Sequence, residues 1–297
     1  MHGISRDTGE TDRARIMSAP RLEIDLDKIR HNARTLVERL DARGISVTAI
    51  TKATMGLPEI TSALLDAGVK TLGDSRIENI EAMRRNGTAE TISLIRSPML
   101  SQVERVAACA DISFNSELEV MRSLSRAAQR LRRRHGVVLM VELGDLREGI
   151  MPSDLEQTVR ELLPLPNLVL KGIGTNLACR SGVTPDERNM AELSALAEAI
   201  EAKFGLTLDI VSGGNSANLD WALGNHAGGR INNLRLGEAI LLGCEPLRRQ
   251  PIEGLHTDAI TLVTEVIESK VKPSKPWGQL GQAAFGEKVT PVAVSYT

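Results

Sequence analysis

The hydrophobic positions of the chain fall into two patterns that alternate along most of its length. Apolar residues that recur every three or four positions, as at Met121, Leu124 and Ala128, predict amphipathic helices. A first helix is expected at about 27–40. Between the helical patterns lie short β-like runs that begin near Ser46, Thr71, Thr91, Asp111, Val137, Leu168, Leu208 and Ile231.

Glycines punctuate this alternation where predicted helices end. Because glycine accommodates a positive φ without a steric penalty, it commonly closes a helix. The four glycines expected in this role are Gly68, Gly87, Gly136 and Gly205. Eight strands that alternate with helices predict an α/β protein with a parallel sheet. The sheet either closes as a barrel or stays open and doubly wound, and the number of elements fits both.

Composition removes several function classes. The 297 residues carry a formal net charge of -2, and aromatic residues make up only 2%, so nothing indicates a nucleic-acid or membrane-surface partner. The basic run at 130–135 (RLRRRH) follows a predicted helix and is interpreted as a solvated helix end, in preference to an anion or RNA site. No apolar segment approaches membrane-spanning length.

Cysteine usage predicts an intracellular protein. Cys109, Cys179 and Cys244 are widely spaced and show no metal-like spacing, so we expect reduced thiols, a cytoplasmic location and no metal site.

Polar residues follow the predicted strands. Lys52 ends the first of them, Arg96 the third, Asn176 and Cys179 follow the sixth, and Arg235 ends the eighth. In a parallel barrel the carboxyl ends of all strands meet at one face, where substrates bind. A lysine at such a position is suited to form a Schiff base, although most strand-end lysines simply reach for water.

The segments LEIDLDKIRHN (22–32) and TAITKAT (48–54) resemble the N-terminal domain of the alanine racemase family, and most closely its ornithine racemase-like branch. The resemblance extends through six motifs from Arg21 to Gly286. It implies a (β/α)8 TIM barrel and decides against the open sheet. It also implies that pyridoxal 5'-phosphate is carried on Lys52.

The domain organisation expected from this resemblance has three parts. Residues 1–19 form a disordered tail, with Met17 as a plausible alternative start, and residues 20–255 form the cofactor-binding barrel. Residues 256–297 contain a strand at 260–267 and form a truncated start of the family's C-terminal β-domain. We also expect a homodimer.

The turn VSGGNSAN (211–218) resembles the family's phosphate-binding turn. Gly214 lets the backbone approach an anion, and Asn215 and Ser216 open a helix whose free N–H groups favour a phosphate. Spacing alone fits an ordinary capped strand-to-helix turn equally well. Gly237 and Glu238 follow the eighth strand and supply a second set of backbone donors.

Arg235 lies in NLRLGE (233–238), which resembles the family's Arg-(Pro)-Gly signature with Leu236 in place of proline. The resemblance implies that Arg235 faces the pyridine nitrogen of the cofactor. Because arginine does not give up a proton near neutral pH, that nitrogen stays unprotonated, which favours simple removal and return of the α-proton. An ion pair of Arg235 with Glu238 or Glu142 is the alternative.

The segment MVELGDLREG (140–149) aligns with the racemase pattern V-D-T-G-M-G-R-x-G. Arg147 is therefore a candidate for binding the substrate carboxylate or for ordering the catalytic groups. Asp145 and Glu148 are additional acids that could bind the distal ammonium group of ornithine or lysine. An ion-pair network at a strand end is the structural alternative.

The segment GIGTNLAC (172–179) aligns with the racemases' T-H-F-A segment, and Asn176 replaces a histidine that contacts the cofactor there. Cys179 is the candidate for the second acid/base, because a thiol near cations exchanges protons readily, although a lone cysteine is more often a packing residue. In alanine racemases a tyrosine of the partner subunit has this role, and the one tyrosine here is Tyr296.

These residues favour an amino-acid racemase with an ornithine, lysine, alanine or serine substrate. A single-barrel carrier that binds the cofactor without turnover is the alternative. An aldolase or dehydratase of the same barrel type ranks below both, because the expected His-x-Cys pair near the C-terminus is missing.

Overall fold

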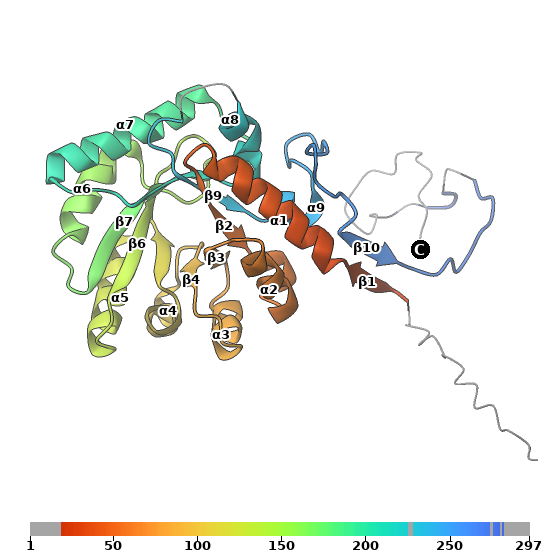
Figure 1. The fold of residues 1–297 in the computed structure, drawn as a ribbon, viewed down its shortest axis with the longest axis horizontal. Helices are drawn as coiled ribbons and strands as arrows, with labels where there is room; N and C mark the ends of the chain where they lie inside the picture. The colour runs from red at the N-terminus through yellow and green to blue at the C-terminus, as the bar shows by residue number, and fades with distance from the viewer. Residues whose placement is uncertain (1–18, 225–227, 274–275, 280, 282–297) are drawn as a thin grey trace, which may run out of the picture. The chain divides into compact units, whose positions relative to one another are not determined.

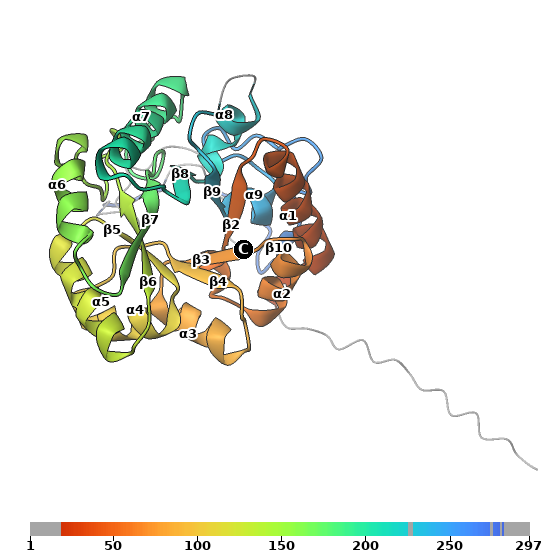
Figure 2. The same cartoon turned by 60° about the vertical axis from the view of Figure 1, so that its left-hand side comes forward.

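The computed structural model describes residues 19–224, 228–273, 276–279 and 281. Eight parallel strands close into a barrel in their order along the chain. Helices surround the strands on the outside (Figures 1 and 2). The strands of the barrel are β2 (Ser46–Ile50), β3 (Thr71–Asp74), β4 (Thr91–Leu94), β5 (Ile112–Asn115), β6 (His135–Met140), β7 (Leu168–Gly174), β8 (Ile210–Gly214) and β9 (Asn233–Leu236).

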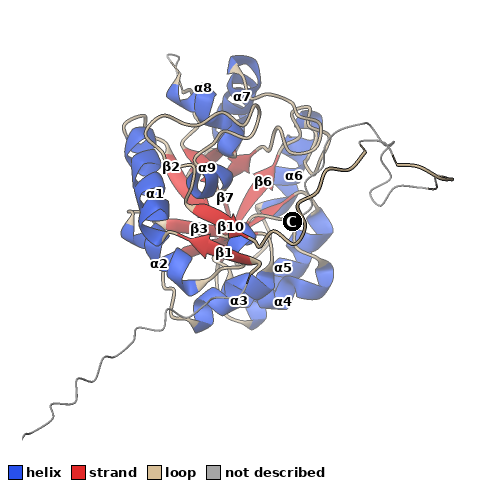
Figure 3. Cartoon of the chain, turned by 90° about the vertical axis from the view of Figure 1, so that its right-hand side faces the viewer, coloured by secondary structure: helices blue, strands red, loops and turns tan. Residues whose placement is uncertain are grey.

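The helices follow the strands as the sequence pattern predicts, and Figure 3 shows them in blue around the red strands. The longer ones are α1 (Leu26–Asp41), α2 (Pro58–Asp66), α3 (Ile77–Arg85), α4 (Val103–Cys109), α5 (Leu118–Arg130), α6 (Pro152–Leu162) and α7 (Glu187–Phe204). Shorter turns of helix are η1 (Lys52–Thr54), η2 (Leu100–Gln102), η3 (Ser216–Asn218), α8 (Leu219–Leu223) and α9 (Glu238–Leu242).

The closed sheet confirms the barrel and excludes the doubly wound alternative. The predicted strand starts at Ser46, Thr71, Thr91 and Leu168 coincide with the observed ones, and the other four differ by at most two residues. Nearly continuous burial explains this agreement, because strands that are buried on both faces appear in the sequence as continuous apolar runs.

Local chemistry explains where the helices begin and end. Asp25 caps α1 by accepting N–H bonds from Asp27 (3.0 Å) and Lys28 (3.1 Å). The buried face of α1 consists of Ile29, Ala33, Leu36 and Leu40, which repeat every three or four positions. At the end of α7, Gly205 adopts φ 63°, as the sequence predicts.

The prediction for Gly136 is wrong. Gly136 lies inside β6, where a Cβ atom would stand 2.9 Å from Ile112 Cγ1 and 3.0 Å from Lys171 Cγ. Glycine is therefore required here by close packing between strands and not by a helix end. His135, which the sequence analysis placed in a solvated helix end, is instead buried in β6. Its Nε2 lies 2.7 Å from Ser113 Oγ.

A second compact unit contains β1 (Arg21–Ile24) and β10 (Ile260–Val263), whereas the barrel unit is Asp25–Ala259. The two strands pair antiparallel from Arg21↔Val263 to Ile24↔Ile260. The strand predicted at 260–267 is present but ends at Val263. The tail predicted over residues 1–19 and Tyr296 lie outside the described residues, apart from Ala19.

Candidate active site

A cavity of about 360 Å³ opens at the carboxyl ends of the barrel strands. Most of the site residues predicted from the sequence line it, whereas Gly214 and Asp145 do not. The lining residues include Lys52, Arg147, Asn176, Cys179, Asn215, Ser216, Arg235, Gly237 and Glu238. The chain therefore brings together groups from five different strand ends, as the barrel topology requires.

Lys52 is the first residue of η1, directly beyond β2. The preceding residue Thr51 is anchored twice: its N–H donates to Gly73 O (2.9 Å) and its hydroxyl donates to Asp74 Oδ2 (2.8 Å). Asp74, fully buried, also accepts from Arg76 N and Asn79 Nδ2. Asp74 thus fixes the turn that carries Lys52. The Lys52 side chain itself is exposed, because the strand end opens into the cavity.

The turn after β8 depends on Gly214, which adopts φ 146°. A Cβ atom there would lie 2.1 Å from Asn218 Oδ1, so only glycine fits. The Asn218 oxygen accepts from Asn215 N (3.0 Å), while Asn215 Oδ1 accepts from Ala217 N (2.8 Å). Gly214 therefore acts by shaping the turn, which explains why it does not line the cavity.

Ser216 connects this turn to the end of β9. Its hydroxyl, which is buried, accepts a hydrogen bond from Ala239 N (3.2 Å) in α9. Gly237 precedes α9 and packs against Ile50, whose Cβ a side chain at Gly237 would approach to 3.2 Å. The starts of η3 and α9 are therefore held side by side at the cavity. Glu238 forms an ion pair with Arg249.

Arg235 is almost completely buried, with 5% of its surface exposed. Nη1 donates to Ser212 Oγ (2.6 Å), and Nη2 donates to Thr175 O (2.7 Å) and Asn176 Oδ1 (3.3 Å). The guanidinium lies over the Phe114 ring at 5.1 Å. The predicted alternative, an ion pair with Glu238 or Glu142, is wrong, because neither carboxylate reaches it.

Burial lowers the pKa of Arg235 to about 10, and the positive charge of Arg147 adds to the effect, whereas Glu148 and Cys179 oppose it. The group still keeps its proton at neutral pH. Of its five N–H groups, those at Nε and one at Nη1 meet no acceptor among the described residues.

Asn176 joins Arg235 to the turn after β8. Its Oδ1 accepts from Arg235 Nη2 and from Asn215 Nδ2 (3.1 Å). Its Nδ2 is buried and has no hydrogen-bond partner in the described part of the chain. A buried N–H group that lines a cavity without a partner is unfavourable unless a ligand accepts from it.

The segment 142–149 curls around Glu142. The carboxylate accepts N–H bonds from Gly144, Leu146 (3.0 Å) and Arg147 (3.1 Å). Gly149 lies so close that a Cβ atom would stand 2.6 Å from Glu142 N. The E-x-G-x-x-R-x-G spacing therefore belongs to a loop whose backbone N–H groups bind the carboxylate of its own first residue, Glu142. Arg147 of this loop lines the cavity.

Asp145 does not bind a substrate ammonium group, contrary to the sequence expectation. It is fully buried and accepts N–H bonds from Cys179 (3.2 Å), Arg180 (2.8 Å) and Ser181 (3.0 Å). Burial acts to raise the pKa of Asp145, but these N–H bonds outweigh it and the pKa lies below its ordinary value. Asp145 clamps the loop after β7 onto the loop after β6.

The Arg147 side chain contacts Cys179. Its Nη1 lies 2.9 Å from Cys179 Sγ, and its Nε lies 2.6 Å from Glu148 Oε2. Cys179 is an exposed free thiol. The second oxygen of Glu148 has no partner among the residues that the structure describes, so Glu148 remains available to a ligand.

Sequence reasoning missed several residues of this cavity. Pro246 and Arg249 come from the segment after α9, and Ser75 from the end of β3. Arg96 was placed at a strand end but given no role, although it lines the cavity as well. Its position beyond an apolar strand was the available signal.

These residues fit pyridoxal 5'-phosphate. An amine (Lys52), a buried guanidinium with spare N–H groups (Arg235) and an unpartnered buried amide (Asn176) face one cavity, and two strand-to-helix turns meet there at Ser216. The donor set matches a ligand with an aldehyde, a ring nitrogen and a phosphate.

Comparison with known proteins identifies the family. A model of the alanine racemase N-terminal domain matches residues 24–246. The chain belongs to this family. Among its relatives are an ornithine racemase of Acetoanaerobium sticklandii, 38% identical over 91% of this chain and 76% of the relative, and a lysine racemase of Thermotoga maritima, 36% identical over 92% and 76%. The resemblance to the ornithine racemase-like branch is confirmed.

Solved structures of other proteins share the fold. The structure of an alanine racemase of Clostridium difficile 630 superposes on this structure with a TM-score of 0.67 at 20% sequence identity. The superposition covers 84% of this chain. This chain spans 64% of that structure's chain, less than two thirds. A D-threonine aldolase of Filomicrobium marinum gives a TM-score of 0.64 at 17% identity over 75% and 62% of the two chains. At such identities the likeness shows the fold alone.

The described residues lack two further kinds of feature. No three or more His, Cys, Asp or Glu side chains among them gather in a way that could hold a metal ion. No helix in the same ranges combines the length and apolar character needed to span a membrane.

Proposed function

We propose that the protein is a pyridoxal 5'-phosphate-dependent amino-acid racemase that interconverts L- and D-amino acids. The observation that carries the proposal is the convergence of Lys52, Arg235 and the Arg147–Cys179 pair on one cavity. The 36–38% identity to ornithine and lysine racemases over more than nine-tenths of the chain supports it.

The bound cofactor supplies an electron-withdrawing ring that acidifies the α-proton of an attached amino acid. Lys52 carries the cofactor and moves the proton at one face of the α-carbon. Arg235 would supply a positive charge to the ring nitrogen without giving up its proton. Ser216 and the N–H groups near Gly237 hold the phosphate. The rigid network of Asn176 and Asn215 keeps Arg235 in place.

Cys179 is the proposed acid/base at the opposite face. Arg147 Nη1 lies 2.9 Å from its sulfur, and both residues line the cavity. Among substrates we propose ornithine or lysine first, because the free oxygen of Glu148 is suited to a distal ammonium group. A homodimer, a cytoplasmic location and the expected three-part domain division stay predictions.

Incubation of the purified protein and cofactor with single L-amino acids in D₂O tests the proposal. A racemase incorporates deuterium at the α-carbon and forms the D-enantiomer at the same time. A protein that binds the cofactor but exchanges no α-proton with ornithine, lysine, alanine or serine would be the carrier instead.

Replacement of Cys179 by alanine tests the second acid/base in the same assay. One stereochemical direction of α-proton exchange should fall about 10²-fold or more, while the other direction persists. Cys109→Ala, which alters a cysteine at the end of α4 outside the cavity, is the control. Exchange that is unchanged in both directions would show that Cys179 is not the second acid/base.

A further inference from the structure

The segment after α9 forms a tight loop that reaches the active-site cavity. The two ends of the loop are joined by a hydrogen bond from Glu245 N to Gln250 O (3.0 Å). Two residues of the loop, Pro246 and Arg249, line the cavity. The loop therefore brings one more positive charge, that of Arg249, to the candidate active site.

A buried carboxylate fixes the shape of this loop. The Glu245 side chain accepts N–H bonds from Leu247 (2.7 Å), Arg248 (2.9 Å) and Gln250 (3.0 Å). Burial acts to raise the pKa of Glu245, but these N–H bonds outweigh it and the pKa lies below its ordinary value. Between the bonded positions, Arg249 adopts φ 58°, a conformation that residues other than glycine rarely take up. The loop therefore holds the Arg249 backbone in an uncommon conformation through a bonded network.

The bonded neighbours of Arg249 place it at the turns that follow β8 and β9. Its Nη1 forms an ion pair with Glu238, and the next residue, Ala239, donates its N–H to Ser216 Oγ (3.2 Å). Ser216, Gly237 and Arg249 line the same cavity. Arg249 Nε and Nη2 have no acceptor in the described part of the chain.

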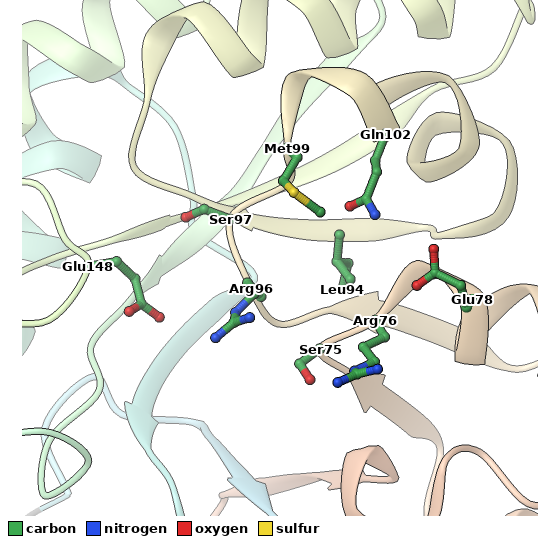
Figure 4. A pocket seen from close by; sticks show the side chains of 9 residues that line it. All are labelled: Ser75, Arg76, Glu78, Leu94, Arg96, Ser97, Met99, Gln102 and Glu148. Carbon is green, nitrogen blue, oxygen red and sulfur yellow. The ribbon is translucent and has the colours of Figure 1, made fainter.

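The other arginines of the cavity are held at different strand ends. Arg235 donates to groups at the ends of β7 and β8, and Arg147 contacts Cys179. Arg96 also lines a neighbouring cavity of about 520 Å³ at the ends of β3 and β4, which Figure 4 shows together with Arg76. In the closed eight-stranded barrel, β4 lies opposite β8. Arg249 is therefore the arginine that the fold places at the turns after β8 and β9.

We propose that Arg249 binds the phosphate group of pyridoxal 5'-phosphate and that Glu238 holds the Arg249 guanidinium in place. The proposal rests on the proposed cofactor-dependent function. A phosphate group is strongly anionic at neutral pH, and the planar fork of a guanidinium matches its oxygens with two parallel N–H bonds. Since Nη1 is on Glu238, the edge formed by Nε and Nη2 would bind the phosphate. The ion pair also offsets the negative charge of Glu238, which would otherwise repel the phosphate.

Titration of the apo-protein with two forms of the cofactor tests the assignment. Pyridoxal 5'-phosphate carries the phosphate group, whereas pyridoxal lacks it. Arg249→Gln should weaken the binding of pyridoxal 5'-phosphate about 10- to 100-fold and leave the binding of pyridoxal unchanged. Arg249→Lys should lose only part of the affinity, because it keeps the charge and loses the fork.

Two further variants separate a phosphate contact from a general effect of charge. Arg248→Gln is the matched control, because it removes an exposed guanidinium one position away that does not line the cavity. It should change neither affinity. The double variant Arg249→Gln with Glu238→Gln removes both members of the ion pair and keeps the backbone N–H of residue 238. Binding of pyridoxal 5'-phosphate should stay weak in this double variant, because the phosphate has lost its guanidinium.

Several outcomes would overturn the proposal. Unchanged binding of pyridoxal 5'-phosphate in Arg249→Gln, or an equal loss for pyridoxal, would show that Arg249 does not contact the phosphate. Recovery of the wild-type affinity in the double variant would show that Arg249 only neutralises Glu238. An equal loss in Arg248→Gln would reduce the effect to net charge. Phosphate-dependent binding through Arg249 without any α-proton exchange would contradict the racemase function and leave this assignment standing.

Discussion

The two sides of the barrel mouth differ in how completely their polar groups are satisfied. On the side of β7, β8 and β9, Arg235, Asn176 and Asn215 are tied into one network, and Arg235 is buried. On the side of β3 and β4, Arg76 and Arg96 are exposed, and their guanidinium groups have no protein partner in the described ranges. The first side is built to hold a permanent group rigidly, whereas the second leaves charge free for a ligand that comes and goes.

The largest expected effect concerns the rigid side. Arg235→Glu places a proton-bearing or negative group where the guanidinium now faces the cavity, so racemisation should fall about 10²-fold or more. Transamination should rise at the same time, because a protonated ring nitrogen withdraws electrons more strongly. Chiral chromatography and product analysis measure both. Arg235→Lys keeps the positive charge and should keep transamination low. A rise in transamination with Arg235→Lys as large as that with Arg235→Glu would show that charge is not what matters.

The next effect compares two neighbouring acids. Asp145→Ala should lower the free energy of unfolding by about 2–3 kcal/mol, because several N–H groups lose their acceptor. Glu148→Ala removes one partly exposed ion pair and should cost less than about 1 kcal/mol. Urea denaturation measures both variants. Similar losses in free energy would show that Asp145 is not the clamp between the loops after β6 and β7.

The pH dependence of the Asp145 contribution has a definite sign. Because the folded state lowers the pKa of this carboxyl, its stabilisation is present above the unfolded value of about 3.9 and is lost as the pH falls through the folded value. The difference between wild type and Asp145→Ala should therefore shrink below about pH 4. A difference that grows on acidification would contradict the clamp.

A smaller effect concerns the cofactor itself. Ser216→Ala removes a hydroxyl near the phosphate turns and should weaken cofactor binding by about 1.5–3 kcal/mol. A bulky change, Ser216→Leu, should weaken it further by filling the turn. Ser97→Ala, on the open side, is the matched control and should leave the affinity unchanged. Titration of apo-protein with pyridoxal 5'-phosphate measures all three. Equal affinities for wild type and Ser216→Leu would place the phosphate elsewhere.

The sequence predicted the barrel because hydrophobic periodicity and strand-end polarity are both local patterns. It brought Lys52, Arg235 and Cys179 to one face for the same reason. It could not show that Asp145 turns away from the cavity, because the N–H groups that capture it lie 34 to 38 positions along the chain. The sequence also could not show that the Arg96 guanidinium is unpaired, because no local pattern indicates which ion pairs form in the fold.

The central claim is that Lys52 carries pyridoxal 5'-phosphate at the mouth of the barrel, and borohydride reduction followed by peptide mapping tests it most directly. The account predicts an absorbing protein whose reduced pyridoxyl label maps to Lys52 and disappears in Lys52→Ala. A protein that stays colourless with added cofactor, or that carries the label on another lysine, would contradict it.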